Sequence, residues 1–182
     1  MSNNAARILV ILVAIAAAAA LRLVPHPPNF TPIGAMALFS GAMLGRRGLI
    51  ALAAPLGALL LSDLALGLFY PGMAFVYSSV ALVVVIGWAV ASRRSVLAVG
   101  VAALASAISF FVLTNFGMWL FSGLYPLTPS GLAACYVAAI PFFQNTLAGD
   151  LFYSALLFGG FALLERAMPR LRASVATLAA HR

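Results

Sequence analysis

Residues 33–66, IGAMALFSGAMLGRRGLIALAAPLGALLLSDLAL, form two apolar runs joined by a short turn that holds two arginines. Apolar runs of this kind form bilayer-spanning helices, and short loops rich in arginine stay on the cytoplasmic side. The stretch therefore predicts a helical hairpin that enters the membrane, turns inside at Gly45–Gly48 and returns outward. Because the first run, at 33–44, is shorter than the roughly 20 residues of a full crossing, we expect it to be tilted or shielded from lipid by other helices.

The alternation of apolar runs and arginines extends along the whole chain. It predicts an all-α, polytopic membrane protein with a single domain at 1–182 and six transmembrane helices, at 8–24, 33–44, 49–66, 73–91, 96–121 and 145–164. All ten basic residues are arginines, and a chain that starts inside places nine of them in the cytoplasm and only Arg22 outside. This distribution predicts a multi-pass inner-membrane protein with both termini in the cytoplasm.

The composition supports the same class of protein. The chain is 65% hydrophobic and 7% charged, whereas soluble domains have about 25% charged residues. The sequence pI is about 10.8, but the positive charge lies at helix ends, where it suits anionic lipid headgroups better than nucleic acid. We therefore expect membrane lipid, and no nucleic acid, among the partners.

Two outward segments are rich in proline. Residues 25–32, PHPPNFTP, predict an extended strap, because prolines prevent a continuing helix. Residues 123–131, GLYPLTPSG, predict a second outer loop. The apolar piece that follows, at 132–140, is too short to span and is bounded by Pro141, so we expect an outer-surface or re-entrant helix separate from the span at 145–164.

Most polar side chains capable of chemistry lie in the outward half. Asp63 and Asp150 sit at similar depth within spans, where an ionised carboxylate costs several kcal/mol unless it is paired or hydrated. A water-accessible cavity that opens outward would explain both. The candidate substrate-binding residues are Arg22, His26, Asn29, Thr31, Asp63, Asn115, Trp119, Tyr125, Cys135, Asn145 and Asp150.

Structural roles compete with binding roles at several of these positions. Arg22 could pair with Asp63 or Asp150, or hold an anionic group of a ligand, and the sequence favours neither. His26 suits an ordinary surface position. Cys135 suits a small buried hydrophobe, and no metal-ligating residue is spaced near it, so we expect no metal site.

Catalytic motifs with a recognisable spacing are missing from the sequence. We therefore expect no enzymatic activity and no cofactor. A pair formed by Asp63 and Asp150, acting as an intramembrane aspartyl dyad, is a weaker alternative.

Residues 62–67, SDLALG, and 145–150, NTLAGD, are similar to segments of the S-components of energy-coupling-factor vitamin transporters. The chain also resembles these proteins in size, number of spans, cytoplasmic termini and outward cavity. The resemblance implies an S-component-like bundle and an ATP-hydrolysing partner complex. It further implies that small residues of the first helix dock the transmembrane partner, at Ala14, Ala16, Ala18 and Ala20.

A fuller likeness is to an uncharacterised family of small bacterial membrane proteins associated with transport. It is carried by residues 25–32, 114–117 (TNFG), 134–136 (ACY) and 141–146 (PFFQNT), and it covers most of the chain. This likeness implies a role in transport and brings no substrate with it.

Together these features predict binding of a small, vitamin-like solute from the outer side and its uptake across the inner membrane. A solitary transporter of cobalamin type is a variant, suggested by Cys135. The rival interpretation is an assembly or stabilising subunit of a larger membrane complex, in which Asp63 and Asp150 would be neutralised within a filled interior. Solute binding instead predicts a cavity of a few hundred Å³.

Overall fold

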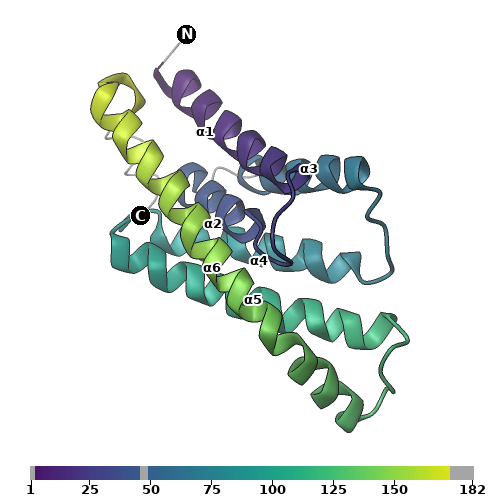
Figure 1. The fold of residues 1–182 in the computed structure, drawn as a ribbon. Helices are drawn as coiled ribbons and strands as arrows, with labels where there is room; N and C mark the ends of the chain where they lie inside the picture. Colours follow the sequence, from purple (N-terminus) through teal and green to yellow (C-terminus); the bar gives the residue numbers. More distant parts are fainter. Residues whose placement is uncertain (1–2, 46–48, 173–182) are drawn as a thin grey trace.

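The computed structural model describes residues 3–45 and 49–172, and in this part of the chain every regular element is a helix. The elements are α1 (Asn3–Ala20), the 3₁₀ turn η1 (Leu21–Leu23), α2 (Ile33–Leu44), α3 (Leu49–Leu66), α4 (Met73–Val90), α5 (Val96–Phe121), α6 (Pro129–Ala167) and the 3₁₀ turn η2 (Pro169–Leu171). Figure 1 shows α3, α4 and α5 in a row, with the long α6 crossing in front of the bundle.

Five helices are long and apolar enough to cross a membrane, namely α1 with η1, α3, α4, α5 and α6. The sixth, α2, is apolar but shorter. These helices confirm the all-α class and indicate a membrane location for the protein.

Most helix boundaries follow the predicted spans closely. The ranges 33–44, 49–66 and 96–121 coincide with α2, α3 and α5, and α4 ends one residue before the predicted position 91. The first helix begins at Asn3, earlier than predicted, because the polar residues before the apolar run join its first turn. The predicted inner turn falls largely on residues 46–48, which lie outside the described residues.

Helix α2 lies at the centre of the bundle. All 12 of its residues are buried, and it contacts each of the other five helices. It crosses α4 with almost no space between the backbones, since a Cβ atom on Gly41 would lie 2.1 Å from the Val84 carbonyl oxygen and one on Gly87 2.5 Å from that of Leu38. Glycine at these positions lets the two backbones touch. The prediction that neighbouring helices shield the short span is confirmed.

The predicted break at Pro141 is wrong. Helix α6 runs through this residue without interruption from Pro129 to Ala167, so the apolar piece at 132–140 is its first part and not a separate surface helix. A proline removes one backbone donor, and hydrophobic helices tolerate the loss when the packing on both sides holds the axis. Here Ala139 and Gly149, on either side of the proline, are both buried.

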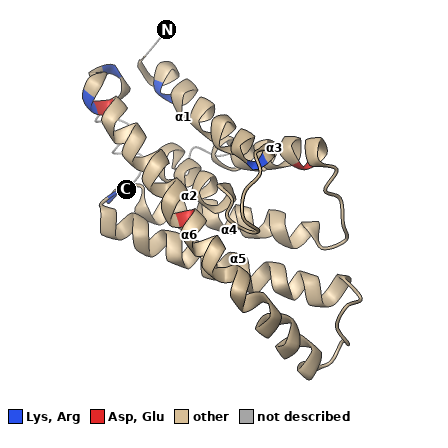
Figure 2. Cartoon of the chain, in the orientation of Figure 1, with Lys and Arg blue, Asp and Glu red and all other residues tan. Residues whose placement is uncertain are grey.

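The charged residues gather at one end of the bundle. Figure 2 shows a group of them where α1 begins and α6 ends, and Arg94, after α4, lies 4.0 Å from Glu165 of this group. We call this the inner end. Arg22, Asp63 and Asp150 lie away from that end and line a cavity in the other half of the molecule, which we call the outer half. The ends are named for the predicted topology.

Candidate functional site

A cavity of about 810 Å³ occupies the outer half, between α3, α4, α5, α6 and the strap at residues 25–32. This volume lies in the range of roughly 300–1,000 Å³ that is typical of small-molecule sites. The polar side chains in its lining are Arg22, Asn29, Thr31, Asp63, Tyr70, Tyr77, Thr114, Asn115, Ser122, Tyr125, Cys135, Thr146 and Asp150.

Aromatic rings make up much of the remaining wall. Phe110 and Phe111 of α5 and Phe142 of α6 face the cavity. Phe111 packs against Phe143 and Tyr136, with ring centroids 5.3 Å and 5.6 Å apart. These contacts between α5 and α6 hold one apolar wall of the cavity in place.

Asp63 lies at the outer end of α3 and has a partner on each carboxylate oxygen. Its Oδ1 is 2.8 Å from Nη1 of Arg22, and its Oδ2 accepts a 2.9 Å hydrogen bond from the hydroxyl of Tyr77. Arg22 also donates to the hydroxyl of Ser62. The pair is nearly excluded from solvent, so these extra hydrogen bonds help to offset the cost of burying two charges. Of the alternatives for Arg22, the structure selects pairing with Asp63, and this triad joins η1, α3 and α4.

Tyr70 stands in the loop between α3 and α4, at the rim of the cavity. Burial raises the pKa of its phenol, and the negative charge of Asp63 raises it further, while Arg22 acts in the opposite direction. The hydroxyl therefore stays protonated at neutral pH and can donate a hydrogen bond into the cavity.

Asp150 has a different environment. It lies in α6, is 3% exposed, and its carboxylate faces the backbone N–H of Ala35 in the first turn of α2. Its carboxylate sits so close to Gly34 that a Cβ atom there would lie 2.3 Å from Oδ1. The first N–H groups of a helix have no partner within the helix and attract negative charge. Asp150 therefore caps α2 from another helix, and within the described residues no arginine pairs with it.

The proline strap rests on α6. Asn145 donates a 2.9 Å hydrogen bond from Nδ2 to the carbonyl oxygen of Pro28. Phe30 stacks on Phe152 and Tyr153, at 5.8 Å and 5.6 Å between ring centroids. Asn29 adopts a left-handed backbone conformation with φ 64°, which asparagine tolerates better than most residues. These contacts hold the strap across the cavity.

The loop before α6 is fastened in a similar way. Trp119 of α5 donates from Nε1 to the carbonyl oxygen of Pro126, at 2.9 Å. Thr128 caps α6 by accepting from the backbone N–H of Gly131, and a Cβ atom on Gly131 would lie 2.0 Å from the Pro126 oxygen. The loop therefore folds back over the end of α5.

Eight of the eleven predicted binding residues line the cavity together, namely Arg22, Asn29, Thr31, Asp63, Asn115, Tyr125, Cys135 and Asp150. The other three do not line it. Asn145 and Trp119 fasten its covering segments, and Nδ1 of His26 lies 3.0 Å from the carbonyl oxygen of Pro27.

Sequence reasoning missed several lining residues. For Tyr77, the only indication in the sequence is its place at the outer start of α4, at the depth of Asp63. For Thr146 and the rings of α5, no pattern of polar residues indicates a place in the lining. Cys135 is buried, with Sγ 3.4 Å from the carbonyl oxygen of Asn115. Among the described residues no group of three metal-ligating side chains comes together.

The small residues predicted to dock a partner fall on two faces of α1. Ala18 is buried in the core, and Ala14 is partly buried and packs against the core. Ala16 and Ala20 are exposed. Only the second pair is therefore accessible to a partner helix.

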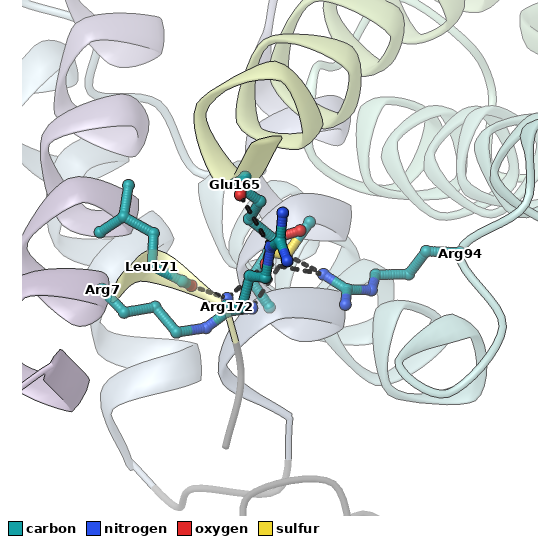
Figure 3. Close-up of polar contacts among 6 residues, drawn as sticks. Arg7, Arg94, Glu165, Leu171 and Arg172 are labelled. Atoms are coloured by element: carbon teal, nitrogen blue, oxygen red, sulfur yellow. Dashed lines mark hydrogen bonds and ion pairs between the residues drawn. The ribbon is translucent and has the colours of Figure 1, made fainter. Parts of the chain in front are cut away.

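A compact charge cluster closes the inner end (Figure 3). Arg7 of α1, which is 4% exposed, donates to the carboxylate of Glu165 and to the carbonyl oxygen of Leu171. Arg94, after α4, has Nη1 4.0 Å from the same carboxylate, and Arg172 donates from Nε to the Glu165 carbonyl oxygen at 3.1 Å. One glutamate thus joins α1, the segment between α4 and α5, and the end of α6.

The chain belongs to a family of unknown function, DUF6580, whose model matches residues 2–171. No curated protein and no solved structure matches the chain. The description of the family names no activity, so a function has to be argued from the cavity itself.

Proposed function

We propose that this protein binds a small, vitamin-like solute in the outer cavity and takes part in its uptake across the inner membrane of a bacterium. The observation that carries this proposal is the cavity of about 810 Å³, which is lined by polar groups from several helices. A chain that only filled space in a complex has no need of such a volume. In this proposal both termini face the cytoplasm, and the strap and the 123–131 loop act as gates.

The proposed mode of action follows the S-components that the sequence resembles. Capture would take place from the outer side, and an ATP-hydrolysing partner complex would drive release inward. Ala16 and Ala20 on α1 are the exposed small residues that such a partner could approach. A solitary transporter of cobalamin type is the variant of this proposal. Neither mode assigns an enzymatic step to the chain.

An assembly or stabilising role is the second candidate. The neutralised Asp63, paired with Arg22 and Tyr77, is the arrangement that this candidate predicts. It gives no account of the cavity next to that pair. We therefore rank solute binding first.

Native mass spectrometry of the protein, extracted gently from its own host, tests the proposal. We expect a co-purified small molecule that is lost in Ala138→Trp, because Ala138 lines the cavity and an indole there would fill it. The matched control is Ala134→Trp, one turn earlier on α6 at an exposed position outside the lining, and it should keep the molecule. Protein subunits that co-purify with no small molecule would favour the assembly role instead.

A further inference from the structure

The two carboxylates in the cavity lining differ in their remaining capacity to accept hydrogen bonds. An ionised carboxylate has about four acceptor sites on its two oxygens. Asp63 is bound at both oxygens, by Arg22 and by Tyr77. Asp150 faces one backbone N–H, that of Ala35. By this count Asp63 has about two acceptor sites left, whereas Asp150 has more, and no cationic side chain among the described residues pairs with Asp150.

The charged residues of the lining also favour Asp150 as the group that binds a ligand. Arg22 is the one arginine among the described lining residues, which include two aspartates. The salt bridge with Asp63 already uses it, so among the described residues only the N-terminal end of α2 faces the carboxylate of Asp150 with positive polarity. Such an end carries roughly half of a positive charge. A carboxylate placed this deep in a membrane protein is normally paired, so a cation delivered by the ligand would complete the site.

The wall of the cavity defines the rest of the ligand. Phe110, Phe111 and Phe142 offer ring faces, and Met73 and Met118 add polarizable surface. Rings of this kind bind apolar bodies, and they also attract a nearby cation through their faces. An anionic ligand would instead meet the carboxylate of Asp150, which has no cationic side chain beside it among the described residues.

We propose that the solute is an organic cation, with a protonated nitrogen that binds Asp150 and an apolar, ring-containing body that packs against the phenyl rings of α5 and α6. This inference rests on the proposed function and names the substrate class of the same cavity. Asp63 then serves to hold η1, α3 and α4 together, and Asp150 recognises the solute.

Three matched probes test this inference on the purified full-length protein in detergent micelles at pH 7. They are 2-phenylethylammonium, 2-phenylethanol and phenylacetate, which share a ring and differ in charge, and binding is measured by calorimetry. We expect the ammonium probe to bind about tenfold more tightly than the other two, the ratio that a charge-assisted hydrogen bond provides. Ala138→Trp should abolish this binding, which locates it in the cavity.

Asp150→Asn keeps the shape of the side chain and should reduce the affinity for the ammonium probe to that of the alcohol. This variant also weakens the cap of α2, so the ranking of the three probes on the unaltered protein is a test that does not depend on it. Equal or tighter binding of phenylacetate or 2-phenylethanol, or no binding of the ammonium probe, would overturn the inference. The proposed function is judged separately, because an anionic or neutral molecule found by native mass spectrometry would refute the cation and leave solute binding standing.

Discussion

The two ends of the bundle use the same side-chain chemistry for opposite results. At the inner end, Glu165 is shared by Arg7 and Arg94, and the groups close on one another. In the outer half, the pair of Arg22 and Asp63 borders a cavity of about 810 Å³. A buried ion pair therefore does not by itself distinguish a clamp from a binding site. The cavity beside the outer pair is what distinguishes the two.

Between the two ends lies an aromatic layer. Phe39 of α2 meets Phe158 and Phe161 of α6 edge to face, with ring centroids 5.3 Å and 5.7 Å apart. The guanidinium of Arg7 lies 5.0 Å from the centre of the Phe161 ring. The inner cluster thus contacts this layer directly, and none of the three rings lines the outer cavity.

The strongest test of the contrast is Glu165→Ala. It leaves the buried guanidinium of Arg7 without its carboxylate, and the loss of one partner of a buried pair costs about 3–5 kcal/mol. We expect a corresponding fall in the free energy of unfolding, measured by denaturant titration in micelles. The neighbouring Arg166→Ala, at an exposed position, should change it by less than about 0.5 kcal/mol. Equal effects of the two substitutions would show that the inner cluster is not a clamp.

Gly87→Ala tests the close contact of α2 and α4. The added methyl group would meet the Leu38 carbonyl oxygen at 2.5 Å, and overpacking of this kind costs about 1–3 kcal/mol. Gly100→Ala is the matched control, since a Cβ atom there meets nothing within 4 Å. We expect thermal unfolding at a lower temperature for the first variant only. A stable Gly87→Ala protein would mean that the helices can separate without cost.

Tyr77→Phe tests how much the hydrogen bond from Tyr77 to Asp63 stabilises the outer half. It removes one of the two partners of Asp63 and keeps the salt bridge to Arg22. A hydrogen bond to a charged group contributes about 1.5 kcal/mol, so we expect a loss of that size in the free energy of unfolding. Tyr125→Phe, in the same cavity lining, should cost less. If the two were equal, the hydrogen bond from Tyr77 to Asp63 would contribute nothing to stability.

The smallest effect is expected for Asn145→Ala, which removes the hydrogen bond between the strap and α6 and leaves the Phe30 contacts in place. The loss of one neutral hydrogen bond costs about 1 kcal/mol and acts locally. Hydrogen exchange at residues 25–32 should become faster, with the rest of the bundle unchanged. Gln144→Ala, at the exposed neighbouring position, should leave the exchange as it is. Unchanged exchange in both variants would indicate that Phe30 alone holds the strap.

The sequence was most informative about the helices and least about their mutual contacts. Long apolar runs bounded by arginine or proline leave little choice of element, which explains why α2, α3 and α5 have their predicted boundaries. The break predicted at Pro141 failed because packing on both sides of a residue is not visible in the residue itself. The partner of Asn145 is 117 positions away in the chain, and no local pattern marks such a contact.

The same limit applies to the two aspartates of the site. Asp63 and Asp150 were placed at one depth and given one role, because hydropathy reports depth and nothing about neighbours. The structure separates them by their surroundings, the Arg22 guanidinium for Asp63 and the first turn of α2 for Asp150. The surroundings of each carboxylate depend on which helices meet, and this is decided by tertiary packing.

The complete burial of α2 has a consequence for the behaviour of the protein in different membranes. A helix that faces lipid must match its apolar length to the bilayer, and it tilts or shifts when the thickness changes. All 12 residues of α2 are buried, so α2 has no lipid-facing surface whose length must match the thickness of the bilayer. The turn that carries Ala35, and the carboxylate of Asp150 above it, are therefore positioned by protein contacts and insulated from variation in lipid composition.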